Sequence, residues 1–329
     1  MNRQHVLRAA CAAALALIAG TTAGTAAATP SATAWPTKPV KFIIPFPPGG
    51  TLDFIGRQLA QKLQEQLGQT FIVENRAGGN GVIGSDAVAK SAADGYTLLF
   101  NASTFTTTPM TMKAVPYDVQ RDFQPVAMVA KAPLAVSVNN NLPVKDIKGL
   151  IAHAKANPGK LSFAIGSTGS AGNLATELLK RTGPVELLIV PYKGTAPAFQ
   201  DLIGGQIEGF VDPLLGAVNF HKTGKLKIIA VTSKARVPTL PDVPTVGESI
   251  PGYDFYSWYG VWGPAKLPAE VTTRLNAEVN KALAGELREK LVSQGIVPGG
   301  GSVEDFLKFQ REDMARSQKI ITEVGIRAE

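Results

Sequence analysis

Residues 40–68 read VKFIIPFPPGGTLDFIGRQLAQKLQEQLG, and the order of elements in this stretch is the basis for predicting the fold. Residues 40–46 are a short apolar run, which predicts a strand, and the Pro-Pro-Gly-Gly run at 47–50 ends it. Apolar residues then recur every three or four positions, which predicts a helix that stops at Gly68. These helical positions are Leu52, Ile55, Leu59, Leu63 and Leu67.

The same alternation of strands and helices continues along the chain. The pattern predicts strands over 70–74, 96–100, 134–138, 161–165, 186–190, 206–211 and 226–231, and helices over 82–90, 146–156, 171–181 and 197–203. An aromatic strand over 253–262 and two helices, starting near Pro268 and Ser302, follow. Such alternation implies βαβ units and a mostly parallel sheet. We therefore expect an α/β fold in two blocks of similar size, with a cleft between two lobes.

The first residues are predicted to be a secretory signal peptide. Arg3 and Arg8 precede an uncharged run over 9–28, and small residues fit the cleavage rule after Ala34 or after Ala28. The alternative is an uncleaved membrane anchor, but the run is rich in Ala, Gly and Thr rather than Leu. No later segment approaches 18 uninterrupted apolar residues, so no membrane insertion is expected after cleavage.

Cleavage would change the composition from which function is judged. Removing 34 of the 329 residues leaves 295, and losing Arg3 and Arg8 lowers the formal net charge from +7 to +5. The single cysteine, Cys11, leaves with the signal peptide, so a disulfide scaffold is excluded. The remaining basic residues are dispersed, whereas nucleic-acid binding needs a dense basic stripe. We therefore expect no nucleic-acid partner, and a mild positive field that aids capture of anionic solutes.

Five turns rich in glycine or hydroxyl residues precede helical patterns. Free N–H groups and the positive end of the helix dipole favour anions at such turns, and glycine allows close approach of a ligand to the backbone. Ordinary turn and N-cap chemistry explains any one of them alone, whereas five on one rim favour an anion-binding cleft. The turns are residues 49–51, 78–81, 101–104, 167–172 and 193–195.

Enzyme and cofactor signatures are largely missing from the sequence. Residues 79–84 fit G-x-G-x-x-G, but the next strand ends at Asn101 rather than at the acidic residue of a dinucleotide site, so no cofactor is expected. No G-x-S-x-G or P-loop motif occurs. The two histidines beyond the signal, His153 and His221, are far apart in the sequence, which argues against zinc. Asp53 and Asp212 follow strands and are the candidates for a general base.

Long stretches of the chain resemble the Bug proteins, which are periplasmic solute receptors of tripartite tricarboxylate transporters. The resemblance begins with WPTKPVK at 35–41 and PFPPGGTLD at 45–53, and continues through VENRAGGNGVIGSDAVAKSAADGYTLL at 73–99. It includes PYKGTAPAFQDLIGGQIEGFVD at 191–212 and LKIIAVTSKARVPTLPDVPTVGESIPGYDFYSWYGVWGPAKLP at 226–268. The resemblance implies a two-lobed periplasmic binding protein fold of type II, the Venus flytrap, with lobe 1 over 35–135 and 253–329 and lobe 2 over 136–252.

The resemblance also implies which residues hold the ligand, a small carboxylate bound by backbone N–H groups and bridging waters. Asn173 stands where the family often has histidine, and Phe54 and Phe105 are bulkier than expected beside the first-lobe loops. Phe105 is open to two interpretations, a cavity wall or a core residue. The implied ligand-binding residues are Gly49, Gly50, Thr51, Asp53, Ala77, Gly78, Ser103 and Thr104 in lobe 1, and Ser167, Thr168, Gly169, Ser170, Asn173 and Asp212 in lobe 2.

Together, the turns and the resemblance lead us to expect a periplasmic receptor that is not an enzyme and holds no metal. It would capture a small carboxylate or dicarboxylate between its lobes as a monomer, and deliver it to membrane permease subunits or a sensor. The alternative is an exported α/β hydrolase or lyase that uses Asp53 or Asp212 as its base. A structural or adhesive protein would need repeats or anchoring signals, and the sequence shows none.

Overall fold

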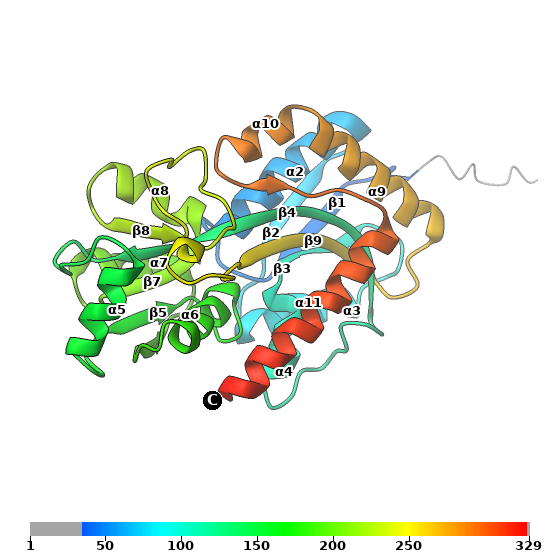
Figure 1. Ribbon diagram of the computed structural model, residues 1–329. Coiled ribbons are helices and arrows are strands. Elements are labelled where there is room, and N and C mark those ends of the chain that lie inside the picture. The colour runs from blue at the N-terminus through cyan, green and yellow to red at the C-terminus, as the bar shows by residue number, and fades with distance from the viewer. Residues whose placement is uncertain (1–34, 328–329) are drawn as a thin grey trace, which may run out of the picture. The chain divides into compact units, whose positions relative to one another are not determined.

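A sheet of ten strands is the frame of the described part of the chain, residues 35–327, in the computed structural model (Figure 1). Neighbouring strands follow the order β2-β1-β3-β9-β4-β7-β5-β6, and β8 and β10 also pair with β4. The strands are β1 (Val40–Ile44), β2 (Phe71–Asn75), β3 (Thr97–Ala102), β4 (Phe123–Val138), β5 (Ser162–Ile165), β6 (Leu188–Pro191), β7 (Gly209–Pro213), β8 (Lys227–Val231), β9 (Tyr256–Pro264) and β10 (Val297–Pro298). The predicted signal peptide, residues 1–34, lies outside the described residues.

The long strand β4 is common to both parts of the sheet. From Phe123 to Pro133 it pairs with β9, and from Leu134 to Val138 it pairs with β7, with β8 alongside (Figure 1). We call residues 36–133 and 256–327 the first half of the molecule, and residues 134–255 the second half. Each half contributes its own strands, so β4 is the element that makes one sheet out of two.

The sheet is mixed, and the prediction of a mostly parallel sheet is wrong. β4 runs antiparallel to every strand with which it pairs, and β9 runs antiparallel to β3. Only β1 with β2 and β3, and β5 with β6 and β7, keep the parallel βαβ arrangement. The pattern predicted only the end of β4, because Pro125 and Pro133 interrupt the earlier apolar run. In the structure Pro125 lies beside a shift in strand register, where proline is tolerated.

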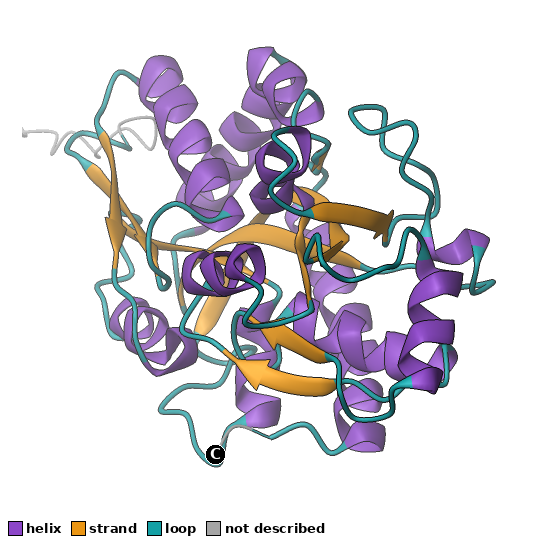
Figure 2. Ribbon diagram, turned by 90° about the vertical axis from the view of Figure 1, so that its left-hand side faces the viewer, coloured by secondary structure: helices purple, strands orange, loops and turns teal. Residues whose placement is uncertain are grey.

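Helices surround the strands in both halves (Figure 2). Gly68 ends α2 in the left-handed conformation, at φ +66°, as the sequence predicts. Within residues 35–327 no helix is both long enough and apolar enough to cross a membrane. The helices of the first half are α2 (Thr51–Leu67), α3 (Val82–Ala89), α4 (Thr104–Thr111), α9 (Ala269–Ala284), α10 (Glu286–Val292) and α11 (Val303–Val324), and those of the second half are α5 (Ile147–Ala156), α6 (Ala171–Thr182), α7 (Thr195–Gly204) and α8 (Leu214–Lys222).

Three of these helices, α4, α8 and α10, are absent from the sequence prediction. The sequence of α4, TFTTTPMT, has poor helix propensity and includes Pro109. Its threonines are buried, and the hydroxyl of Thr108 donates to the carbonyl oxygen of Thr104 at 2.8 Å. Tertiary packing rather than intrinsic propensity therefore stabilises α4.

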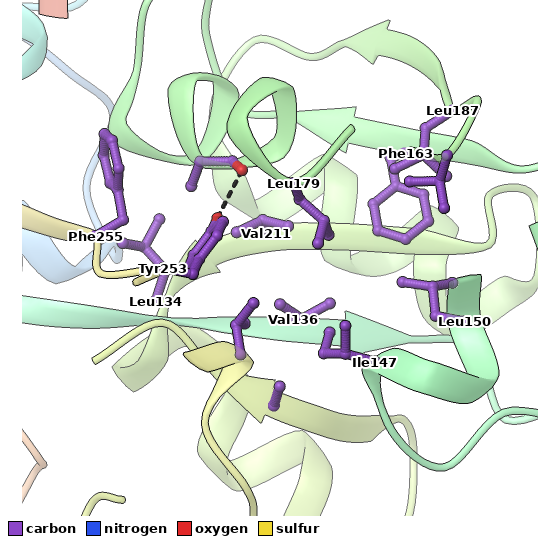
Figure 3. Packing of buried hydrophobic residues seen from close by; sticks show 14 of the residues in the cluster. Leu134, Val136, Ile147, Leu150, Phe163, Leu179, Leu187, Val211, Tyr253 and Phe255 are labelled. Carbon is purple, nitrogen blue, oxygen red and sulfur yellow. Dashed lines mark hydrogen bonds between the residues drawn. The ribbon is translucent and has the colours of Figure 1, made fainter. Parts of the chain in front are cut away.

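The buried apolar residues form separate clusters in the two halves, and Ile320, Ile321 and Ile326 of the first half join the cluster of the second. In the second half the cluster joins β4, β5, β7, α5 and α6, and the Tyr253 hydroxyl donates to the Ala175 carbonyl oxygen at 2.7 Å (Figure 3). In the first half Phe105 is only 1% exposed, and its ring centre lies 4.7 Å from that of Phe123 and 5.0 Å from that of Trp262. Of the two interpretations of Phe105, the structure supports the core residue.

Candidate ligand-binding site

A cavity of about 130 Å³ lies at the carboxyl ends of several strands, with residues of both halves in its wall. This is the edge at which ligands bind in open α/β sheets. Ala102, Thr104, Ser257 and Tyr259 complete the wall from the first half. The other lining residues are 46–48 and 50–52 after β1, 166–167 and 170–172 after β5, 193–197 after β6, and 212–213 at the end of β7.

Four helices begin at this cavity. Their first residues are Thr51 of α2, Thr104 of α4, Ala171 of α6 and Thr195 of α7, and all four line the wall. The first N–H groups of a helix have no partner within the helix, and they carry the positive end of its dipole. Such a convergence of N-termini makes the cavity favourable for an anion.

The starts of α2 and α7 face each other. Their N-cap residues are Gly50 and Gly194, and neither helix has a capping side-chain hydrogen bond. A Cβ atom built on Gly50 would lie 3.5 Å from the Thr195 hydroxyl oxygen. Because no capping side chain intervenes, backbone N–H groups of both helices can reach a ligand placed between them.

Asp53 holds the loop before α2 and does not line the cavity. Its carboxylate accepts hydrogen bonds from the Gly49 N–H at 3.1 Å, from Asn75 Nδ2 at 2.9 Å and from Arg57 Nε at 3.0 Å. Burial raises the pKa of Asp53, but the hydrogen bonds from Arg57, Asn75 and Gly49 together hold that pKa below its ordinary value. Asp53 is therefore an ionised support for the glycine turn.

The loop before α6 is held from both halves. From its own half, Asn173 Oδ1 accepts from the Gly169 N–H at 2.9 Å. From the first half, the Thr107 hydroxyl donates to the Gly169 carbonyl oxygen at 2.7 Å, and Asn80 Nδ2 donates to the Thr168 carbonyl oxygen at 2.9 Å. Asn80 lies in a short 3₁₀ helix, η1 (Gly79–Gly81), and has φ +55°. Asn173 thus supports the loop from within.

A second cavity, of about 460 Å³, adjoins the first. The two share lining residues on both sides, including Phe46, Ser167 and Lys193. Lys193 is exposed and forms no ion pair with another described residue. Phe46 and Lys193 therefore lie where the two cavities meet.

The predicted site residues fall into three groups. The first cavity is lined by Gly50, Thr51, Thr104, Ser167, Ser170 and Asp212, and the second by Ala77, Gly78, Ser167 and Thr168. Neither cavity is lined by Gly49, Asp53, Ser103, Gly169 or Asn173. Within the described residues these five are neighbours of the wall.

Sequence reasoning missed Phe46, Lys193 and Tyr259. Lys193 belongs to one of the five turns, so the sequence indicates its position but gives no signal that its side chain lines a cavity. Tyr259 comes from β9, far along the chain, and no local signal could place it there. Burial raises its pKa, so it stays a neutral hydroxyl in the cavity wall.

Asp212 ends β7 and lines the first cavity. It is 8% exposed, and it forms no side-chain hydrogen bond or ion pair with another residue in 35–327. Burial raises the pKa of its carboxyl well above the ordinary value. Within the same range no group of three or more His, Cys, Asp and Glu side chains is placed to hold a metal ion.

Comparison with known proteins assigns the chain to a family. Residues 55–326 match the family model described as the tripartite tricarboxylate transporter family receptor. Protein BugT of Bordetella pertussis is 36% identical over 298 residues, which cover 88% of this chain and 90% of BugT.

Two solved structures share the fold. R. palustris Rpa4515 with adipate has a TM-score of 0.86 at 37% identity, covering 89% of this chain and 99% of that one. MatC from Rhodopseudomonas palustris with bound malate has a TM-score of 0.81 at 28% identity, covering 87% and 100%. These matches confirm the resemblance to Bug proteins and the periplasmic binding protein fold. The chain belongs to the tripartite tricarboxylate transporter receptor family, a family of periplasmic solute-binding proteins.

Proposed function

We propose that this protein is a periplasmic receptor that binds a small carboxylate in the first cavity. The observation that carries the proposal is the convergence of four helix N-termini, those of α2, α4, α6 and α7, on one wall. Backbone N–H groups supply the hydrogen bonds that a carboxylate needs. The adipate and malate held by the two similar solved structures support the same ligand class.

The charges of the cavity fit a receptor that holds its ligand by backbone groups. No arginine is among the described residues that line either cavity, and Lys193 is their one basic side chain. A carboxylate is thus oriented by N–H groups, with Lys193 supplying a counter-charge at the junction. The apolar wall of Phe46, Pro47 and Pro197 suits the hydrocarbon part of such a ligand.

We propose that the chain forms two lobes, lobe 1 over 35–135 and 253–329 and lobe 2 over 136–252, whose internal boundaries lie within about three residues of those between the two halves. The change of pairing partner along β4, between Pro133 and Leu134, supports a boundary at this point. Ligand binding would favour the closed arrangement through contacts that exist only there. The receptor would act as a monomer, exported by the signal peptide at 1–34, and pass its ligand to permease subunits or a sensor.

The hydrolase or lyase alternative finds less support in this arrangement. The Asp53 carboxylate is occupied by three donors, and Asp212 has neither a histidine nor a nucleophile bonded to it among the described residues. His153 and His221 line neither the first nor the second cavity. The geometry therefore favours binding over turnover.

The test is a thermal-shift screen on refolded, ligand-stripped protein with adipate, malate, succinate and benzoate. A ligand at 100 times its Kd adds about 2.7 kcal/mol to the free energy of unfolding, which raises Tm measurably. At least one of these carboxylates should raise Tm. No shift with any of them at millimolar concentration would contradict the proposal, and release of a chemically altered ligand would favour the enzyme instead.

A variant at Gly50 tests whether the loop before α2 forms part of the binding site. The φ of Gly50 is −86°, so valine fits the backbone, but its side chain would project between the starts of α2 and α7. We expect Gly50→Val to abolish carboxylate binding while the far-ultraviolet circular dichroism spectrum stays unchanged. The matched control is Gly204→Val at the far end of α7, where an added Cβ has nothing within 4 Å. Normal affinity in Gly50→Val would remove this loop from the site.

A further inference from the structure

The carboxyl group of Asp212 is the one acidic side chain in the wall of the first cavity among the described residues. It sits at the end of β7, opposite Ala135 of β4, with the start of α6 packed against it. At 8% exposure it has lost most of its hydration, and no protein donor in 35–327 replaces that hydration. Binding by helix N-termini leaves this group without a role.

No charged or titratable group on the surrounding elements forms an ion pair or a hydrogen bond with Asp212 in the described residues. On α6, Glu177 pairs with Lys180, and on α7, Asp201 accepts from the Tyr192 hydroxyl. The other groups are Arg181 of α6, paired with Glu323, Lys131 of β4 over the Phe309 ring, His221 and Lys222 in the last turn of α8, and Lys193 at the cavity junction. Burial raises the pKa of Tyr259 of β9, and its phenol lies near enough to Asp212 for a negative charge on that carboxyl to raise this pKa further. None of them forms an ion pair with Asp212 in the structure.

Two protonation states of this carboxyl have opposite consequences for an anionic ligand. An ionised Asp212 would share a cavity of low dielectric with the ligand carboxylate, and the two negative charges would repel each other. A neutral Asp212 has an O–H donor, and a hydrogen bond from it to a carboxylate oxygen is charge-assisted and short. No described protein group is hydrogen-bonded to either oxygen of Asp212, so this carboxyl group can form a hydrogen bond with a ligand in the cavity.

We propose that Asp212 is a specificity-determining residue that binds its ligand in the neutral form and donates its O–H to a ligand carboxylate oxygen. The inference rests on the proposed carboxylate function and deepens it. The ligand class becomes a carboxylate with no ammonium group at this end, since an ammonium group would need the ionised form. The direction in which burial shifts the pKa of Asp212 agrees with this assignment.

The proposal fixes the sign of the pH dependence. Below the pKa of Asp212 in the free receptor the donor is present, and affinity should not depend on the state of this group. Above that pKa one proton must be taken up for each ligand bound, so affinity should fall by about tenfold per pH unit. The hydroxyls of Thr51 and Ser257 nearby do not ionise in this range and add no such dependence.

The experiment measures adipate binding by isothermal titration calorimetry from pH 6 to pH 9, for wild type, Asp212→Asn and Asp212→Ala. Asparagine keeps a donor but cannot ionise. We expect Asp212→Ala to weaken adipate binding by about tenfold or more, the loss of one charged hydrogen bond, and Asp212→Asn to weaken it much less. Wild-type affinity should fall at alkaline pH, while that of Asp212→Asn stays flat. Asp242→Asn, at an exposed acid of the same half, is the matched control.

Two further measurements separate the possible failures. 2-Aminoadipate differs from adipate by one ammonium group and should bind more weakly; tighter binding that Asp212→Asn abolishes would show an ion pair and overturn the proposal. The infrared difference spectrum of wild type minus Asp212→Asn at neutral pH should contain a protonated carboxyl band, whatever ligand is present. If this band is absent, or if Asp212→Asn and Asp212→Ala weaken adipate binding equally, the donor role of Asp212 is overturned while the proposed carboxylate-binding function stands. If wild type binds none of the carboxylates, the proposed function fails, and the donor role with it.

Discussion

The loop that begins α2 and the loop that begins α6 both line the cavity, but different parts of the molecule hold them. The first loop is fixed by Asp53, which accepts from Gly49, Asn75 and Arg57, all within the first half. The second is fixed partly by Asn173 and partly by two donors of the first half. In the proposed lobe motion the first loop should therefore keep its shape when the halves separate, whereas the second would have its full support only when they meet.

The largest expected effect comes from removing the support of the first loop. Asp53→Ala would remove the charged acceptor of the Gly49 and Asn75 donors, and a hydrogen bond to a charged group contributes about 1.5–3 kcal/mol. We expect a clear fall in the free energy of unfolding and a loss of carboxylate affinity, measured by urea unfolding and calorimetry. Asp53→Asn, which keeps an acceptor oxygen, should lose less. An Asp53→Ala protein with wild-type affinity would show that the loop is ordered without this carboxylate.

An intermediate effect is expected from the two donors that cross between the halves. Thr107→Val and Asn80→Gly each remove one hydrogen bond to the second loop, worth about 0.5–1.5 kcal/mol, and glycine keeps the left-handed backbone of position 80 without strain. In the proposed two-lobed receptor these contacts form only in the closed arrangement, so their loss should lower ligand affinity roughly three- to tenfold, chiefly through faster dissociation.

The control for this pair is Thr111→Val on the same helix, whose hydroxyl donates only to carbonyl oxygens of α4. Thr111→Val should leave the dissociation rate unchanged in stopped-flow measurements. If Thr107→Val and Thr111→Val dissociate at the same rate, the crossing hydrogen bond does not stabilise the closed arrangement.

The smallest expected effect is a pH dependence of the free energy of unfolding that arises from the first loop and not from the second. Asp53 has a pKa below its unfolded value, so its stabilisation is complete above an unfolded pKa of about 3.9 and is lost as the pH falls through the lower, folded value. The hydrogen bonds of the second loop involve amides, hydroxyls and carbonyls, which do not titrate there. Urea unfolding between pH 5 and pH 2.5 should show wild type losing its stability advantage over Asp53→Asn. A constant difference would mean that Asp53 is not the ionised support.

The two loops also show how much of the candidate site can be predicted from the sequence. Both were recognised, because glycine and hydroxyl residues before a helical pattern are a local signal. The signal does not separate a ligand contact from a support residue: Asp53 and Asn173 were predicted to touch the ligand, and the structure places both behind the wall. A buried polar residue in a glycine turn looks the same in either role, and only its partners distinguish them.

The strand–turn–helix units, the glycine stop of α2 and the anion-favouring turns were determined by the sequence alone, because hydrophobic period and glycine conformation act over a few residues. The tertiary structure decided the rest. It made β4 one antiparallel strand shared by both halves, formed α4 from threonines, and brought Tyr259 of β9 and Asp212 of β7 to one cavity. These features depend on residues from distant parts of the sequence being buried together, and a local pattern does not record which distant segments will meet.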